Sequence, residues 1–147
     1  MRRALAVAGI LLSVVAAAPP AAAQAERVGR LQVVVSNVRV QRGHVHIAIC
    51  PQALFLKDGC PFIVIVPARQ GETTTIIDNI PAGTYAAQVF LDENDNDDLD
   101  RTFIGIPEEG VGFSNNPSFT FRAPRFAEAA FRFDGVSGSI SVRLRYY

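Results

Sequence analysis

The sequence is poor in the residues on which zinc, redox and hydrolytic sites depend. Its 147 residues include two cysteines, two histidines, one methionine and no tryptophan. Two cysteines cannot complete a four-thiolate zinc site, and the nine residues between Cys50 and Cys60 are too many for a C-x-x-C redox pair. The sequence also lacks a Gly-x-Ser-x-Gly motif, a phosphate-binding glycine loop and a dinucleotide fingerprint. Composition and motifs therefore argue against the common hydrolases and nucleotide-binding enzymes.

Net charge is lacking as well. The 14 basic residues equal the 14 acidic ones, whereas a nucleic-acid-binding protein shows a clustered basic excess. We therefore expect no nucleic-acid partner. With 49% hydrophobic residues the chain has the usual content for a packed core, and its length suits one domain.

The N-terminus has the order of a secretory signal peptide. Arg2 and Arg3 form a basic start, residues 4–18 are apolar, and small residues follow up to Ala25. The apolar stretch is shorter than the roughly 20 residues of a membrane-spanning helix, although an uncleaved membrane anchor is the alternative. We expect cleavage after Ala25 or Ala23, so that residues 1–25 are the signal peptide. Residues 26–147 would be one periplasmic or secreted domain without a transmembrane segment.

The two cysteines are expected to pair. Export to an oxidising compartment favours a disulfide between Cys50 and Cys60, and two unpaired thiols are the alternative. Closing a loop of this size would stabilise the fold by about 2.5–3 kcal/mol in the chain-entropy treatment.

Alternation of apolar and polar residues with period two is the main structural signal. Ile140, Val142 and Leu144, for example, alternate with serines and arginines, which places one set in a core and the other in water. Residues 62–66 are instead apolar without interruption, which predicts a central strand covered on both faces. Strands are predicted at residues 31–35, 45–49, 62–66, 73–77, 85–91, 131–133 and 139–146.

Turn residues separate these segments. Residues 41–43, 69–71 and 81–83 each end in glycine and are typical of hairpin turns, and residues 135–138 separate the last two strands. Only residues 124–130 have helical character. Seven or eight short strands with frequent turns predict an all-β protein, an antiparallel β-sandwich of the transthyretin-like or immunoglobulin-like type.

One loop concentrates the acidic residues. Residues 92–100 hold six of them, with no lysine or arginine. Oxygen-bearing side chains recur at every second position, as in the Ca²⁺ loop of an EF-hand, and an all-oxygen set favours Ca²⁺ over transition metals. We predict a structural Ca²⁺ site. Its candidate ligands are Asp92, Asn94, Asn96, Asp98 through its backbone carbonyl, and Asp100.

Two positions depart from the EF-hand pattern. The sixth is Asp97 where the sharp turn favours glycine, and the twelfth is Phe103 where a bidentate glutamate is usual. Further ligands would have to come from elsewhere, such as Glu108 or Glu109. The alternative is a solvated hairpin loop rich in Asx turns, in which the unneutralised carboxylates would repel one another.

The remaining candidates are histidines, arginines and phenylalanines. His44 and His46 would share one strand face, so a two-imidazole metal patch is geometrically possible, but without a third ligand we interpret them as an exposed polar face. The C-terminal arginines could form an anion-binding stripe, and we interpret them as the solvated side of edge strands. These are Arg122, Arg125, Arg132, Arg143 and Arg145. The late phenylalanines are interpreted as core, namely Phe113, Phe119, Phe121, Phe126, Phe131 and Phe133.

Three segments together resemble the DUF2141 family of small exported bacterial proteins of unknown function. They are residues 80–85 (Ile-Pro-Ala-Gly-Thr-Tyr) followed by the acidic loop, residues 105–116 (Gly-Ile-Pro-Glu-Glu-Gly-Val-Gly-Phe-Ser-Asn-Asn), and residues 124–131. The resemblance implies a transthyretin-like or immunoglobulin-like sandwich and supplies no catalytic residues. It suggests that the acidic loop and residues 105–116 form one face. We expect Glu108 or Asn115 to approach the loop and help to order it.

The leading functional interpretation is an exported, non-enzymatic β-sandwich that serves as a binding or structural module of the cell envelope, with a Ca²⁺-stabilised acidic loop. Its partner would be an envelope glycan or another envelope protein. The alternative is a carbohydrate-processing or other hydrolytic accessory that uses the loop carboxylates, which would need two carboxyl groups about 5–9.5 Å apart around a sugar-sized groove.

Overall fold

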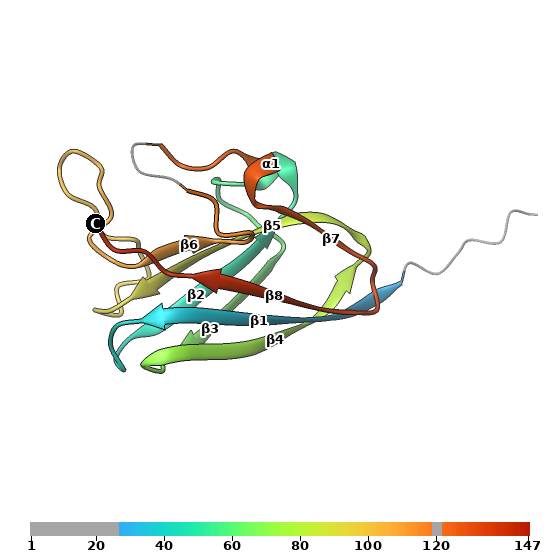
Figure 1. Cartoon of the computed structure of the whole chain (residues 1–147), viewed down its shortest axis with the longest axis horizontal. Coiled ribbons are helices and arrows are strands. Elements are labelled where there is room, and N and C mark those ends of the chain that lie inside the picture. Colours follow the sequence, from blue (N-terminus) through green and yellow to red (C-terminus); the bar gives the residue numbers. More distant parts are fainter. Residues whose placement is uncertain (1–26, 119–121) are drawn as a thin grey trace, which may run out of the picture.

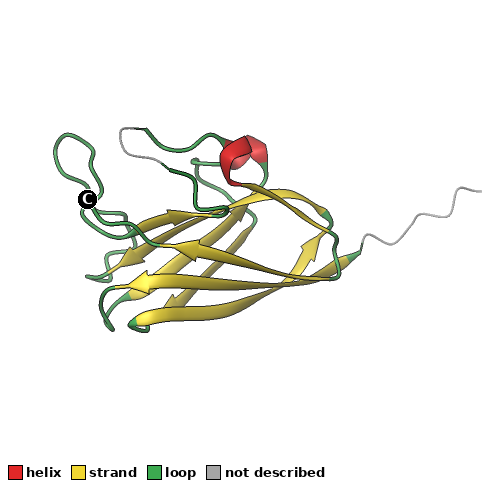
Figure 2. Cartoon of the chain, viewed as in Figure 1, coloured by secondary structure: helices red, strands yellow, loops and turns green. Residues whose placement is uncertain are grey.

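The computed structural model describes residues 27–118 and 122–147. The predicted signal peptide, together with Phe119 and Phe121, lies outside the described residues. The strands are β1 (Val28–Val38), β2 (His44–Cys50), β3 (Phe62–Pro67), β4 (Gly71–Pro81), β5 (Gly83–Asp92), β6 (Val111–Phe113), β7 (Ala130–Phe133) and β8 (Ser137–Arg143). A 3-10 turn at Gln52–Leu54 and one short helix, α1 (Phe126–Ala129), complete the fold (Figure 2). The prediction of an all-β protein is confirmed.

The strands form two packed sheets (Figure 1). One has three strands in the order β4-β1-β8, and the other has five, in the order β3-β2-β5-β6 with β7 also paired to β5. Every pairing is antiparallel except that of β1 with β8, which is parallel. The sandwich therefore closes by bringing its first and last strands together.

The core lies between the two sheets. Alternate residues of β1 and β2 point inward, so Leu31, Val33, Ile47 and Ile49 are almost completely buried in one apolar cluster, as period-two alternation predicts. A second, smaller cluster joins Phe55 and Phe113 to the disulfide that links Cys50 to Cys60. The predicted disulfide is confirmed, and it ties the loop between β2 and β3 to the five-stranded sheet.

The three turns predicted to be hairpins are not hairpins. Residues 41–43 connect β1 to β2, residues 69–71 connect β3 to β4, and residues 81–83 connect β4 to β5. In each case the two strands belong to different sheets. Local turn chemistry shows where the chain reverses, but the choice of sheet depends on which distant strand each segment packs against.

The prediction of a central strand at residues 62–66 is also wrong. β3 is an edge strand whose residues alternate between half-buried and exposed. Phe62, Val64 and Val66 pack against the core, whereas Ile63 and Ile65 are 57% and 49% exposed on the other face. An uninterrupted apolar run is compatible with a strand buried on both faces and with a strand that exposes an apolar surface on one face. β3 is of the latter kind.

Among the described residues, no helix is both long and apolar enough to cross a membrane.

Candidate functional site

The acidic loop begins where β5 ends, at Asp92, and the chain returns through residues 93–110 to β6. Asp92 is 1% exposed because its position on β5 pairs it with His44 of β2. Its carboxylate accepts backbone N–H groups from Asn96 at 3.2 Å and from Asp97 at 2.8 Å. Burial would raise the pKa of Asp92, but the N–H groups of Asp97, Asn96 and Asp95 and the nearby His46 outweigh it and lower that pKa. Asp92 therefore stays ionised and organises the first turn of the loop.

Two backbone positions in the loop have positive φ. Asp95 has φ of 59° and Asp97 has φ of 63°. Aspartate tolerates this left-handed conformation better than most residues, so Asp97 fills the place where an EF-hand has glycine. The turn at residues 41–43 packs closely against the same region, because a Cβ on Gly43 would lie 1.9 Å from the carbonyl oxygen of Asp92.

Three predicted ligands converge on one another. The side-chain amide of Asn94 donates to one oxygen of Asp100 at 2.7 Å, and that of Asn96 donates to the other at 3.1 Å. The amide oxygens of Asn94 and Asn96 accept the backbone N–H groups of Asn96 and Asp98, which are the predicted Asx turns. The loop thus gathers Asn94, Asn96 and Asp100 into one polar cluster that adjoins Asp92.

Glu109 completes this cluster. It is 4% exposed, and its two carboxylate oxygens accept the backbone N–H groups of Glu93 at 2.8 Å and Asp100 at 3.2 Å. Burial raises the pKa of Glu109, with the charges of Asp100 and Asp92 adding to the effect. The buried carboxylates of Asp92 and Glu109 lie near the carboxylate of Asp100, and a hard cation would stabilise negative charges held this close together.

Other predicted residues lie elsewhere. Asp98, predicted to contribute its backbone carbonyl, has an exposed side chain. Glu108 meets the loop through its backbone, whose N–H donates to the carbonyl of Asp100 at 2.9 Å. Asn115 does not support the loop, because its amide donates to the carbonyl of Ala130 at 2.7 Å. It bridges β6 to β7, so it orders the opposite end of residues 105–116.

Basic residues from distant segments face the loop. Arg39 contacts the Glu93 carboxylate at 2.5 Å, Arg42 lies 3.5 Å from it, and Nδ1 of His44 lies 2.6 Å from Oδ1 of Asp95. Arg39 also lies over the ring of Tyr146, 4.4 Å from its centroid. Sequence reasoning missed these partners because they precede the loop by about fifty residues, and only the pairing of β2 with β5 brings them together.

His46 is not part of an exposed polar face, so that interpretation is wrong for this residue. It is 9% exposed and stacks on Phe90 of β5, with ring centroids 4.4 Å apart. Its Nε2 lies 3.5 Å from Oδ2 of Asp92 and 3.8 Å from Oδ1 of Asp97. The acidic loop covers one edge of the ring, which no local pattern around His46 indicates.

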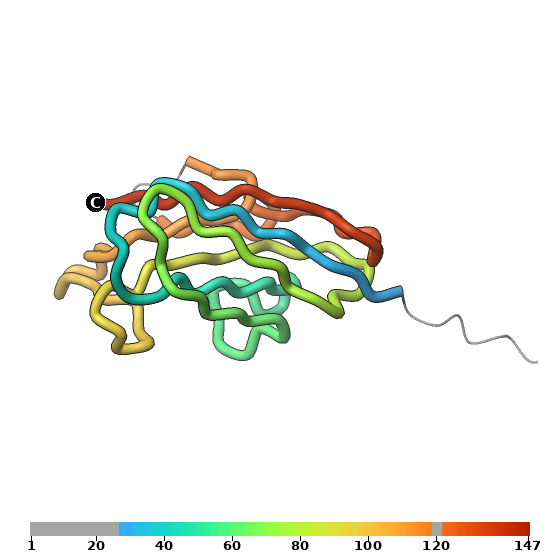
Figure 3. The backbone as a smooth tube through the Cα atoms, turned by 90° about the horizontal axis from the view of Figure 1, so that it is seen from below, coloured from blue at the N-terminus to red at the C-terminus, as the bar shows by residue number. Residues whose placement is uncertain are grey.

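A groove of about 1030 Å³ lies on the outer face of the five-stranded sheet. Residues 56–60, beside the disulfide, and residues 97–107 bound it; in Figure 3 the first lie in the green projection at the bottom and the second toward the yellow-to-orange left end. Directly paired strand residues form its floor in rows, Ala48 with Ile63 and Gln88, and His46 with Phe90. Exposed Leu56, Ile104 and Ile106 form its rim. Charged and polar side chains, among them Lys57 and Asp58, also line the groove, and this combination of apolar surface with polar groups is typical of a binding site.

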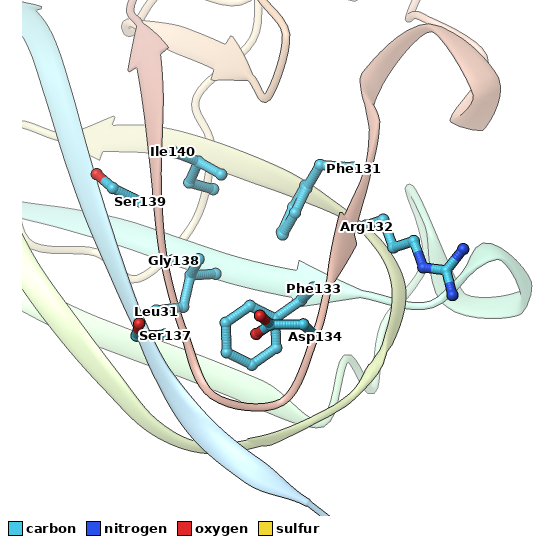
Figure 4. A pocket seen from close by; sticks show the side chains of 9 residues that line it. All are labelled: Leu31, Phe131, Arg132, Phe133, Asp134, Ser137, Gly138, Ser139 and Ile140. Carbon is cyan, nitrogen blue, oxygen red and sulfur yellow. The ribbon is translucent and has the colours of Figure 1, made fainter.

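A smaller cavity of about 300 Å³ lies between β7 and β8 (Figure 4). Its apolar lining, Leu31, Phe131, Phe133 and Ile140, belongs to the core cluster, and the side chain of Arg132 points away from it. We interpret it as the gap where the two sheets diverge.

The C-terminal arginines do not form one stripe. Arg122 binds the Glu128 carboxylate at 2.9 and 3.0 Å and lowers the pKa of Glu128 to about 2, and the backbone N–H of Arg125 donates to the same carboxylate. Arg132 lies on β7 and Arg143 on β8, which belong to different sheets. Of the described phenylalanines, Phe113 and Phe133 are buried, and Phe126 and Phe131 pack against the clusters.

Comparison with known proteins places the chain in a family. Residues 33–141 match the family model described as "Uncharacterized protein conserved in bacteria (DUF2141)", which confirms the resemblance seen in the sequence. No curated protein and no solved structure matches the chain.

Proposed function

We propose that this chain, which belongs to the DUF2141 family, is an exported, non-enzymatic binding module of the bacterial cell envelope. The observation that carries this proposal is the apolar groove on the outer face of the five-stranded sheet. The disulfide supports export, because such bonds persist in oxidising compartments.

The occupant we propose is an apolar segment of another envelope protein. Large apolar side chains are exposed around the groove: Leu56 is 46% exposed, Ile63 57% and Ile104 65%. Because apolar surface predominates over polar surface in the groove lining, we favour a protein segment over a glycan as its occupant. Charged groups at the margin, Lys57 and Arg101 against Asp97, would set the orientation of the bound segment.

The acidic loop would serve this surface as a Ca²⁺-stiffened wall. Asp92, Asp100 and Glu109 offer carboxylate oxygens, and the amide groups of Asn94 and Asn96, which donate to Asp100, would turn their oxygens toward a bound ion, so that the set suits Ca²⁺. Because residues 97–99 line the groove directly, ordering the loop would order the groove. In this proposal the cation is structural.

The hydrolytic alternative has weaker support. It needs two carboxyl groups about 5–9.5 Å apart across the groove. The buried Asp92 and Glu109 accept backbone N–H groups and do not line the groove. The carboxylates that do line it, Asp58 on one wall and Asp97 and Asp98 on the other, are exposed side chains. This arrangement favours a binding role.

Photo-crosslinking tests the proposed partner. A benzophenone amino acid is placed at Ile63 on the groove or at Ile76 on β4, an equally exposed residue of the other sheet at 54%. In producing cells we expect a defined protein adduct from position 63 and none from position 76. The captured protein is then purified, and its Kd for Ile63→Asp should be at least tenfold weaker than its Kd for Ile76→Asp. Equal crosslinking, or equal Kd values, would refute the groove as the binding surface.

A thermal melt tests the proposed cation. Millimolar Ca²⁺ should raise the Tm of the wild type over that in chelator, because a ligand that binds only the folded state stabilises it. The shift should be lost in Asp100→Asn and kept in Asp134→Asn, a change outside the loop. No shift in the wild type would refute the structural Ca²⁺ site and leave the groove proposal standing.

A further inference from the structure

His46 presents a buried nitrogen that no described residue engages. Its Nε2 is inaccessible to solvent and lacks a hydrogen-bond partner among residues 27–118 and 122–147. The distances of 3.5 Å to Asp92 and 3.8 Å to Asp97 exceed the usual hydrogen-bond range of about 2.7–3.2 Å. A buried, unpaired polar atom is costly and calls for an explanation.

The three groups have the spacing of metal ligands. His46 Nε2 and one carboxylate oxygen each from Asp92 and Asp97 lie within 4.8 Å of one another. In a tetrahedral site with bonds of 2.0–2.1 Å, the ligand atoms lie roughly 3.3 Å apart. The two separations from Nε2, 3.5 and 3.8 Å, exceed this by a few tenths of an ångström, and the third, between the two carboxylate oxygens, is at most 4.8 Å.

Two of the three side chains, and the backbone that carries the third, are already held in place. His46 is fixed by its stack on Phe90, and Asp92 by the N–H groups of Asn96 and Asp97. Asp97 is carried on a turn with φ of 63° whose own N–H is bound to Asp92. His46 and Asp92 would therefore lose little conformational freedom on binding a metal, and only the exposed Asp97 side chain would have to be ordered.

We propose that His46, Asp92 and Asp97 bind a divalent transition metal of the Zn²⁺ type. The nitrogen donor excludes Ca²⁺ as the natural occupant, since Ca²⁺ takes oxygen ligands, whereas imidazole with carboxylates suits Zn²⁺. A neutral imidazole and two carboxylates would match the charge of a dication. The site shares only Asp92 with the proposed Ca²⁺ ligands and does not depend on that proposal.

The metal would lie at the wall of the groove. His46 and Asp97 both line it, and a tetrahedral metal with three protein ligands keeps one further coordination position.

Metal titration of the purified, oxidised full chain after chelator treatment tests the site. Zn²⁺ affinity is measured by competition with a chromophoric chelator, and Co²⁺ reports a tetrahedral nitrogen–oxygen site through its visible absorption. His46→Gln and Asp97→Asn should each weaken Zn²⁺ binding at least tenfold. The neighbouring changes His44→Gln and Asp98→Asn should leave it within twofold of wild type.

Two results would overturn the site: wild-type affinity in His46→Gln, or equal losses in all four variants, which would indicate diffuse binding to the acidic loop. Should His46→Gln fail to fold, ¹⁵N spectra of the wild type decide. Zn²⁺ should shift the Nε2 resonance of His46 and leave the ring nitrogens of His44 unchanged, and an unshifted His46 would refute the proposal. The Ca²⁺-dependent Tm shift is measured separately in Asp97→Asn. Failure of the proposed Zn²⁺ site can then be distinguished from failure of the proposed Ca²⁺ site.

Discussion

The two outer faces of the sandwich differ in what their strands expose. On the three-stranded sheet, one paired row runs from Ile76 through Gln32 to Ser139, so an isolated apolar residue lies beside polar ones. On the five-stranded sheet, the row from Ile65 through His46 to Phe90 continues an apolar surface that meets the acidic loop.

The need to form a sheet explains which residues are exposed on the three-stranded sheet, but it does not explain those exposed on the five-stranded sheet. The three-stranded sheet has the pattern of a solvated face, including an exposed ion pair between Arg30 and Asp78 at 2.8 Å. The five-stranded sheet instead carries a groove, a disulfide-bonded loop and a buried polar cluster. The exposed apolar side chains of the groove are unfavourable in water unless a partner covers them, which is why we place function on this face.

Replacing both cysteines by serine should have the largest effect on stability. Loss of the Cys50–Cys60 bond should lower the free energy of unfolding by about 2.5–3 kcal/mol, as measured by urea unfolding. Because the loop packs through Phe55 against Phe113, hydrogen exchange should rise most on the five-stranded sheet. A uniform rise across both sheets would contradict the local role of the bond.

Two turn glycines allow a matched comparison between the region of the acidic loop and a turn away from it. Gly43 (φ +70°) packs against the carbonyl of Asp92, whereas Gly71 (φ +86°) has nothing within 4 Å of an added Cβ. Gly71→Ala should cost about 1 kcal/mol from backbone strain alone, and Gly43→Ala about 1 kcal/mol more because it also displaces the loop. Equal losses in urea unfolding would show that the turn at residues 41–43 does not hold the loop.

The pKa shifts of the two buried carboxylates, Asp92 and Glu109, predict opposite effects of pH on the stability of chelator-treated protein. The lowered pKa of Asp92 means that its stabilisation is present above its unfolded value of 3.8 and is lost as the pH falls through the lower folded pKa. The raised pKa of Glu109 means that stability falls as the pH rises from its unfolded value of 4.5 through the higher folded pKa. Urea unfolding across this range should show both slopes, and Glu109→Gln should remove only the second. An unchanged profile in Glu109→Gln would contradict the assignment.

The smallest effect on stability is expected from the exposed isoleucines. Ile63→Thr and Ile76→Thr should each change the free energy of unfolding by no more than about 0.5 kcal/mol, as is usual for surface positions. A much larger loss at Ile63, measured in the same denaturant series, would mean that this residue supports the fold and would weaken the case for a binding surface.

The sequence predicted features that depend on neighbouring residues. Alternation located the strands, the two cysteines indicated their disulfide, and the spacing of Asn94, Asn96 and Asp100 indicated a convergent loop. It did not predict that β3 is an edge strand or that His46 is buried. Both depend on pairing with distant strands, and an apolar run or a strand histidine has the same local pattern whether a neighbour covers it or not.

Oxidative footprinting of the unaltered protein tests most directly whether the outer face of the five-stranded sheet is the binding face. Hydroxyl-radical labelling is compared between the purified protein and producing cells at Ile63 and Ile104 on the groove and at Ile76 and Val136 away from it, which are all more than half exposed. We expect the two groove residues to be protected in cells and the other two to be labelled equally in both samples. Equal labelling of Ile63 in both samples, or equal protection of all four residues, would contradict the account.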